Sequence, residues 1–171
     1  MTSRIAIVPG TYDPPTLGHL DIIRRAAPFF DRLVVGVVRA PQHKTPLFSD
    51  EERVAFLEEA LAELPNVEVR VFSSLVVDFA RECGAAVMVK GLRAISDFEW
   101  EFQMGHLNAG LAPEIETVFL MSSPQYSFVS SSGVREIAAF GGDVSAYVTP
   151  TVAARLTALR DHDRPDRPAS E

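Results

Sequence analysis

Short runs of apolar residues recur along the chain and predict buried strands. Four runs are almost continuously apolar: residues 5–8, 33–38, 85–89 and 117–121. Continuous apolar runs of this length are typical of parallel strands that are covered on both faces of a sheet. A fifth run, from Val67 to Phe72, alternates apolar and charged side chains, and this alternation favours a position nearer the edge of the sheet.

Helical patterns fill the gaps between the predicted strands. The clearest begins at Ser49, where Glu52 completes a capping box and apolar residues recur on one face until Pro65 ends the helix. Gly84 predicts the end of a helix over residues 75–82. Four further helices are expected over residues 17–30, 96–111, 134–140 and 152–159.

The order of these segments predicts an α/β fold. Strands and helices alternate, and a second helix follows the last pair. This order is typical of a doubly wound, Rossmann-like five-stranded parallel sheet with helices on both faces. The chain of 171 residues can bury a self-sufficient core, and we expect one domain over residues 1–160. Residues 161–171 are charged, with two prolines and almost nothing apolar, and predict a disordered tail without a catalytic role.

The composition limits the cellular environments and the classes of binding partner that are compatible with the chain. Cys83 is the single cysteine, which excludes an intramolecular disulfide and a Cys-based zinc cluster and favours a reducing, cytoplasmic location. The net charge of −7, from 23 acidic and 16 basic residues, argues against a nucleic acid or an anionic membrane as partner. No window approaches the ~20 apolar residues of a membrane span. A phosphorylated small molecule as ligand is compatible with this net charge, because a pocket responds to its own local charges.

Ligands of a doubly wound sheet bind beyond the carboxyl ends of the strands, so the loops there are the candidate site. The loop after the first strand has two glycines, the hydroxyl of Thr11, and His19 in the first turn of the next helix. Lys44 follows the second strand, residues 90–93 follow the fourth, and the hydroxyl-rich segment 127–132 follows the fifth. Together these loops predict a polyanionic ligand, in the first place phosphates. The G-x-G-x-x-G and G-x-x-x-x-G-K-[ST] signatures of dinucleotide sites and P-loops are absent.

Three of these segments resemble motifs of a known family. Residues 10–19 (GTYDPPTLGH) resemble the TxGH form of the nucleotidyltransferase signature. Residues 90–99 (KGLRAISDFE) and the serines at 130–132 are similar to the later motifs of bacterial phosphopantetheine adenylyltransferases. The motifs occur in the same order, and the resemblance extends from about Arg4 to about Leu159. It implies transfer of AMP from ATP to 4'-phosphopantetheine, giving dephospho-CoA and pyrophosphate in coenzyme A synthesis, by a Mg²⁺-dependent, cytoplasmic homohexamer.

The resemblance also implies roles for individual residues. Catalytic contacts with the phosphates are implied for Thr11, His19, Lys44 and Arg93, of which His19 would stabilise charge on the α-phosphate. ATP contacts are implied for Thr11, Tyr12, His19, Gly91, Leu92, Arg93, Glu101, Tyr126, Ser127, Phe128, Val129, Ser130, Ser131 and Ser132. Contacts with the acceptor are implied for Thr11, Lys44, Val76 and Lys90. Mg²⁺ is expected to arrive with ATP, because no acidic cluster suggests a dedicated metal site in the protein.

The sequence departs from the family pattern at two points. Lys90 stands where the family usually has an arginine that grips the phosphopantetheine phosphate. A point charge there replaces a bidentate fork, while the sign of the charge is kept. The segment 41–44 is one residue longer than usual before the lysine, so that His43 directly precedes Lys44 and could be mistaken for the ligand.

Simpler structural interpretations stand beside these roles. His19 alone could cap its helix, and Lys44 alone could be a solvated surface charge. The serines at 130–132 could serve as helix caps as well as phosphate contacts. Asp13 is expected to fix its own loop as an Asx-turn rather than to touch a substrate. Arg93 could pair with an acidic residue of the following helix.

Three aromatic residues, Phe98, Trp100 and Phe102, form a stripe in the predicted helix over residues 96–111. Such a stripe more often belongs to the core than stacks on a nucleotide. Because this one covers more than one helix face, an oligomer interface also stays open as a hypothesis.

Two other functions are compatible with these patterns. A related nucleotidyltransferase with another phosphorylated acceptor would keep the fold. However, cytidylyltransferases and nicotinate-nucleotide adenylyltransferases more often carry histidine at the position of Thr16 and lack the match over residues 90–99. A non-catalytic nucleotide- or CoA-binding protein would belong to a different class. The presence of His19, Lys44 and Arg93 argues against it.

Overall fold

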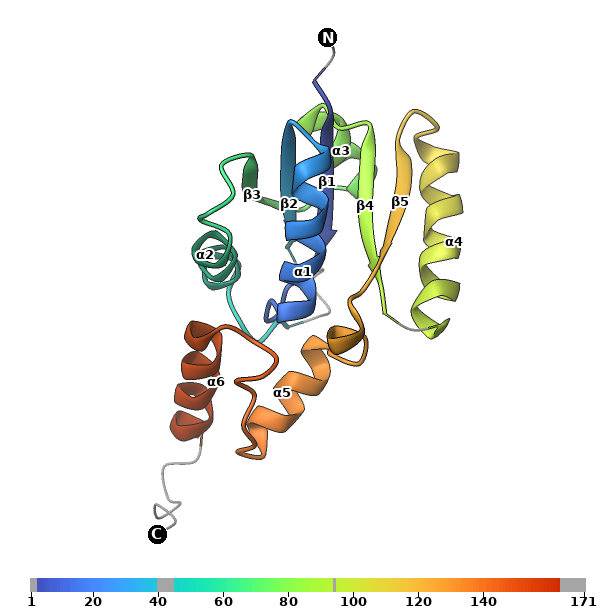
Figure 1. Cartoon of the computed structure of the whole chain (residues 1–171). Coiled ribbons are helices and arrows are strands. Elements are labelled where there is room, and N and C mark those ends of the chain that lie inside the picture. The colour runs from blue at the N-terminus through green and yellow to red at the C-terminus, as the bar shows by residue number, and fades with distance from the viewer. Residues whose placement is uncertain (1–2, 40–44, 94, 164–171) are drawn as a thin grey trace.

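Figure 1 shows the computed structural model of the chain, which describes residues 3–39, 45–93 and 95–163. Five strands form one sheet in the order β3-β2-β1-β4-β5, and every neighbouring pair is parallel. The strands are β1 (Ile5–Gly10), β2 (Arg32–Val38), β3 (Val67–Phe72), β4 (Val87–Leu92) and β5 (Glu116–Met121). The predicted parallel sheet is confirmed, and the alternating strand β3 does lie at an edge.

Within the described residues, helices occupy the predicted gaps. The α-helices are α1 (Leu17–Ala26), α2 (Asp50–Ala60), α3 (Val76–Cys83), α4 (Ile95–Leu111), α5 (Ser131–Ala139) and α6 (Pro150–Asp163). Two 3-10 turns are η1 (Ala27–Phe29) and η2 (Pro124–Tyr126).

Most helix boundaries differ from the prediction by a few residues, and α2 ends at Ala60 and not next to Pro65. The ends of α1 and α6 also differ. α1 ends at Ala26 and passes into η1, because Pro28 has no N–H to donate to the next intrahelical hydrogen bond. α6 continues to Asp163, so residues 161–163 belong to a helix and not to the predicted tail. The rest of that tail lies outside the described residues.

The local signals that set two other helix ends act as predicted. At the start of α2, the Ser49 hydroxyl accepts a hydrogen bond from the Glu52 N–H at 3.2 Å, and the Glu52 carboxylate accepts one from the Ser49 N–H at 3.1 Å. At the end of α3, Gly84 adopts the left-handed conformation with φ of 69°.

The two faces of the sheet are covered by different helices. α1 and α2 pack on one face through residues such as Leu20 and Leu57, and α3 packs on the other face through Phe79. Strand side chains alternate between faces, so β1 contributes Val8 to the first core and Ile7 to the second.

A third group of apolar side chains lies beyond the sheet. Phe48, in front of α2, packs with Val134 of α5 and Val152 of α6. Figure 1 shows α5 and α6 beyond the end of the sheet toward which β1 points. These two helices therefore border the edge at which ligands of a parallel sheet bind.

The prediction that the aromatic stripe of α4 lies in the core is wrong. In the single chain Phe98, Trp100 and Phe102 are 47%, 64% and 51% exposed, and Leu107 and Leu111 of the same helix are also exposed. Figure 1 shows α4 beside β5 at one flank of the sheet. The helix thus presents an uncovered apolar surface, as the oligomer hypothesis requires.

Candidate active site

A cavity of about 1230 Å³ lies where β1 and β4 end. From β1 the chain continues to β2 and β3 on one side of this strand, and β4 and β5 then follow on its other side. The strand order therefore reverses between β1 and β4. The cavity is lined by the following residues among those predicted: Thr11, Tyr12, His19, Lys90, Gly91, Arg93, Glu101, Val129, Ser130, Ser131 and Ser132. The predicted ligand Lys44 lies outside the described residues.

The loop after β1 is held in an unusual backbone conformation. Tyr12 has φ of 52°, a backbone angle that residues other than glycine rarely adopt. Its ring is buried, and its hydroxyl donates to the Val8 carbonyl oxygen at 2.8 Å. A Cβ atom on Gly10 would lie 2.8 Å from this ring, so the close approach needs glycine. The inward turn of Tyr12 leaves Thr11 exposed on the cavity.

His19 occupies the first turn of α1, and its ring orientation is fixed by Thr16. The Thr16 backbone N–H donates to His19 Nδ1 at 3.0 Å, and the ring packs edge-on against Tyr12 with 5.1 Å between the ring centres. Because Nδ1 accepts this hydrogen bond, the neutral ring carries its proton on Nε2. Nε2–H is thus the donor left for a ligand.

The protonation state of His19 follows from its surroundings. Burial, and secondly the positive charge of Arg93, lower the pKa of His19 from 6.5 to about 4. The ring is therefore a neutral hydrogen-bond donor at neutral pH. The influence of Arg93 also means that residues 74 positions apart in the sequence act in one electrostatic environment, as the predicted site requires.

Arg93 ties the end of β4 to the segment before α5. Its Nη1 donates to the Val129 carbonyl oxygen at 2.7 Å. This contact brings the loop after β4 and the loop after β5 together at the cavity wall. The interpretation of Arg93 as a residue that only pairs with an acid of the next helix does not account for this bond.

Lys90 and Glu101 form an ion pair inside the cavity. Lys90 Nζ lies 3.3 Å from Glu101 Oε2, and their side chains are 24% and 19% exposed. The family resemblance assigns Lys90 to the acceptor and Glu101 to the nucleotide. In this structure the two candidate contacts are paired with each other.

The serine segment caps a helix and also borders the cavity, while its contact with phosphates stays a prediction. Ser130 caps α5 by accepting a hydrogen bond from the Gly133 N–H at 3.0 Å, and the Ser131 hydroxyl donates to the Pro14 carbonyl oxygen at 2.8 Å. The first turn of α5 also borders the cavity. A helix N-terminus in this place favours an anion.

Some predicted contacts are not among the residues that line the described cavity. They are Val76, Leu92, Tyr126, Ser127 and Phe128. Val76 packs against the core under α3, Leu92 is buried, and Tyr126 packs against the third core. The Ser127 hydroxyl donates to the Pro124 carbonyl oxygen, and Phe128 is 69% exposed with its ring against Tyr147. Ligand roles for these five side chains stay predictions.

The expectation for Asp13 is wrong in its geometry. Its buried carboxylate does not form an Asx-turn in its own loop but accepts hydrogen bonds from the backbone N–H groups of Leu47 and Phe48, both at 2.9 Å. Arg135 Nη1 also donates to the Asp13 carboxylate at 3.0 Å. Asp13 therefore joins the loop after β1 to the segment that leads into α2.

Several residues of the cavity were not predicted from the sequence. Arg135 is a cation on its wall, and Trp100 and Met104 of α4 also line it. A usable signal for Arg135 existed, because it lies four residues after Ser131 and so on the same face of the helix. Within the described ranges there is no group of three or more His, Cys, Asp or Glu side chains that could hold a metal ion, and no helix suited to cross a membrane.

Comparison with known proteins gives close relatives. A profile of the cytidylyltransferase-like family matches residues 7–137. The phosphopantetheine adenylyltransferase of Methylococcus capsulatus is 57% identical over 151 residues, which cover 88% of this chain and 93% of that protein. The protein of the same name from Thiobacillus denitrificans is 53% identical over 152 residues, covering 89% of this chain and 94% of the relative.

A solved structure supports the fold independently of sequence. A nicotinate-nucleotide adenylyltransferase from Vibrio parahaemolyticus, described as putative, has a TM-score of 0.66 to this chain. The alignment covers 92% of this chain and 93% of that one, at 20% identity. At this identity the likeness concerns the fold alone.

Proposed function

This chain belongs to the phosphopantetheine adenylyltransferase family, within the cytidylyltransferase-like proteins, and on that premise we propose that it transfers AMP from ATP to 4'-phosphopantetheine. The products are dephospho-CoA and pyrophosphate. The observation that carries the proposal is the joint placement of His19 and Arg93 in one cavity at the point where the strand order reverses.

The chemistry needs charge neutralisation more than a base. The phosphate of the acceptor is already an anionic nucleophile at neutral pH, and it attacks the α-phosphorus of ATP in line with the departing pyrophosphate. No covalent intermediate is required. The difficulty is the approach of one anion to another, which positioned donors and cations reduce.

His19 suits this task as a neutral donor. The hydrogen bond from Thr16 fixes its ring, and Nε2–H can donate to an α-phosphate oxygen as charge grows there. Arg93 and the first turn of α5 add positive potential to the same cavity. We assign Thr11 to the transferring phosphates because it is exposed on the same cavity.

The acceptor phosphate is assigned to Lys90, together with Lys44. Lys90 already lies in the cavity, and its ion pair with Glu101 keeps the ammonium group there before the acceptor arrives. The acceptor phosphate then competes with the Glu101 carboxylate for the same cation. This exchange leaves Glu101 available to the nucleotide.

Mg²⁺ is proposed to enter with ATP. The carboxylates of Asp13 and Glu101 on the described cavity wall are already engaged, Asp13 by two backbone N–H groups and Glu101 by Lys90. This donor set fits an ion that keeps several waters and is held mainly by the phosphates. Such an ion would neutralise part of the charge on the triphosphate.

The protein is proposed to act as a homohexamer. The support on this chain is the exposed apolar surface of α4, including Phe102, Leu107 and Leu111. The number of subunits comes from the family resemblance. The cytoplasmic location expected from the single cysteine stays a prediction.

The proposal is tested by pyrophosphate release from ATP with a panel of acceptors. We expect rapid release with 4'-phosphopantetheine and none above background with pantetheine, which lacks the nucleophilic phosphate. Faster release with nicotinate mononucleotide would favour a relative with another acceptor. Tight nucleotide binding without release for any acceptor would favour a non-catalytic binding protein.

A further inference from the structure

Arg53 is the largest side chain that is fully buried in the described part of the molecule. It lies in the first turns of α2, and its exposed fraction is 0%. A buried guanidinium is unfavourable unless all of its donors are paired, so its partners indicate what it holds in place. It lines no part of the cavity, and neither the motifs nor the resemblance singled it out.

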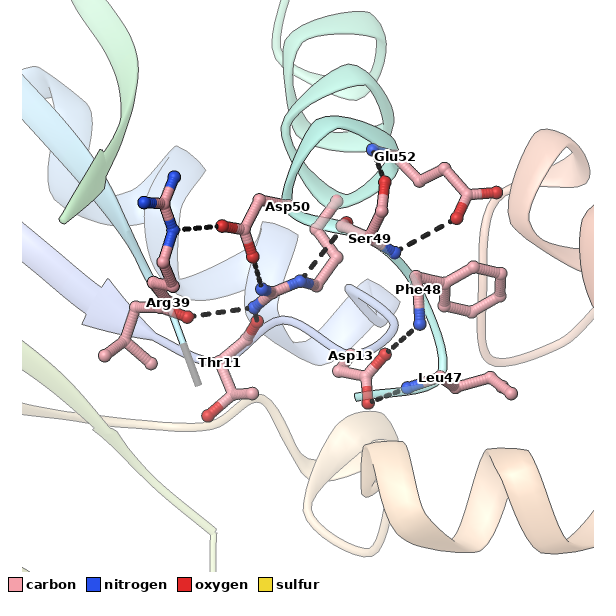
Figure 2. Close-up of polar contacts among 10 residues, drawn as sticks. Thr11, Asp13, Arg39, Leu47, Phe48, Ser49, Asp50 and Glu52 are labelled. Atoms are coloured by element: carbon pink, nitrogen blue, oxygen red, sulfur yellow. Dashed lines mark hydrogen bonds and ion pairs between the residues drawn. The ribbon is translucent and has the colours of Figure 1, made fainter. Parts of the chain in front are cut away.

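The donors of Arg53 join three segments that are distant in the sequence. Nη1 donates to the Thr11 carbonyl oxygen at 2.6 Å and to the Val38 carbonyl oxygen at 3.0 Å. Nε donates to the Ser49 carbonyl oxygen at 3.4 Å, and Nη2 pairs with the Asp50 carboxylate. Figure 2 shows this group of contacts around the start of α2.

The position of these acceptors matters more than their number. The Val38 carbonyl is at the end of β2, and the Thr11 carbonyl directly follows β1. Arg53 therefore fixes the backbone of Thr11 from behind, while Thr11 is exposed on the cavity. A lysine could not keep this arrangement, because one ammonium group lacks the planar fork that reaches several acceptors in different directions.

The partner of Arg53 is itself held in its charged form. Burial alone would raise the pKa of Asp50, but the hydrogen bond from Arg39 and the charge of Arg53 outweigh burial and lower it. A short distance away in Figure 2, Asp13 binds the backbone of Leu47 and Phe48. Two contacts thus connect the loop after β1 to the start of α2. Arg53 binds the carbonyl oxygen of Thr11, and Asp13 binds the backbone in front of the helix.

We propose that Arg53 is a positioning residue for AMP transfer, which fixes Thr11 against the transferring phosphates. The inference rests on the proposed function and adds to it a residue with no contact to substrate. Misplacing a phosphate contact by a fraction of an ångström lowers the rate more than the ground-state affinity. A purely structural Arg53 would instead change stability alone.

The test compares Arg53→Lys with Arg155→Lys. Arg155 donates to Glu52 at 2.7 Å, so it also contacts the first turn of α2, and among the described residues it has no bond to the loop after β1. At a temperature where both variants are folded, we expect Arg53→Lys to lower kcat about 10- to 100-fold with KM for ATP changed less than about threefold. Arg155→Lys should keep kcat within about twofold of the starting protein.

A double-mutant cycle with Thr11→Ala identifies the route of the effect. If Arg53 acts through Thr11, Arg53→Lys should lower kcat by less than about threefold in the Thr11→Ala background. An unchanged kcat in the single variant, or the same fold-loss in both backgrounds, would overturn the proposal. If Arg53→Lys does not fold, Arg53→Gln replaces it, and failure of both to fold would make the role structural and overturn the proposal as well.

A readout without catalysis separates this inference from the proposed function. Amide hydrogen exchange over residues 10–13 should be faster in Arg53→Lys than in Arg155→Lys, because the loop has lost its anchor. If the starting protein releases no pyrophosphate with any acceptor, the proposed function fails while this measurement still reports on the anchor. Equal exchange in the two variants would show that Arg53 does not hold the loop, and would overturn the inference.

Discussion

The two sides of the cavity are built in different ways. On the side of β1 and β2, the backbone is held by buried polar groups, with Arg53 behind Thr11 and Asp13 between two loops. On the side of β4 and β5, the described polar contacts include the partly exposed pair of Lys90 and Glu101 and the hydrogen bond from Arg93 to Val129. The helix α4 on that side leaves its apolar residues uncovered.

This difference separates a preformed region from one that we propose is completed by substrates and a further subunit. Buried and paired polar groups are costly to rearrange, so we expect the described loop after β1 to keep its conformation when a ligand binds. A partly exposed ion pair is weakly favourable and can exchange partners with a substrate phosphate. In the proposed oligomer, the exposed face of α4 would be stabilised by contact with another subunit.

The largest expected effect is on the preformed side. His19→Ala removes a donor directed at developing charge, so we expect turnover to fall by about 10²–10³. ATP affinity should change much less, because a neutral donor contributes little before charge develops. Steady-state kinetics and calorimetric ATP binding measure the two effects, with His162→Ala on α6 as the matched control. Equal losses in turnover and in affinity would contradict the role in the transition state.

The next largest effect concerns the uncovered side. Leu107 and Leu111 are 61% and 57% exposed in the single chain, and replacing both with glutamate places charges on the apolar face of α4. We expect light scattering to change from an oligomer to the 18.7 kDa single chain, with lower activity because α4 also supplies Glu101 to the cavity. Phe29→Glu, at an exposed residue of η1, is the control and should leave the oligomer intact. An unchanged mass for the double variant would exclude this face of α4 as the interface.

A smaller effect is expected at the exchangeable ion pair. Lys90→Arg keeps the charge and adds a bidentate fork, so the KM for phosphopantetheine should stay the same or fall by up to about tenfold. The KM for ATP should be unaffected. Lys90→Met is the comparison and should raise the KM for phosphopantetheine. Complete inactivation of Lys90→Arg would mean that Lys90 does not bind the acceptor phosphate.

The smallest effect is a dependence of stability on pH. Because burial and Arg93 lower the pKa of His19 to about 4, the unfolded chain binds a proton between about pH 6.5 and 4 that the folded protein excludes. The free energy of unfolding should therefore fall as the pH is lowered through this window. His19→Gln should lose less stability over the same window in urea unfolding. Equal losses in both proteins would contradict a His19 that stays neutral in the folded protein.

Local patterns predicted the sheet well and the connections across it poorly. Continuous apolar runs and the alternation in β3 predicted where the strands lie, because the burial of each strand is recorded in its own run of residues. The roles of Asp13 and Arg53 depend on partners 34 and 42 residues away, for which the sequence holds no local signal. The exposure of Trp100 was missed for a related reason, since an apolar stripe looks the same whether the core or another molecule covers it.

Transfer at the α-phosphorus is tested most directly by following the acceptor's own oxygen atoms. Phosphopantetheine with heavy oxygen in its phosphate is incubated with unlabelled ATP, and both products are analysed by mass spectrometry. We predict that all of the label appears in dephospho-CoA, including the bridging oxygen, and that pyrophosphate carries none. Label in pyrophosphate, or consumption of ATP without labelled dephospho-CoA, would contradict the proposed reaction.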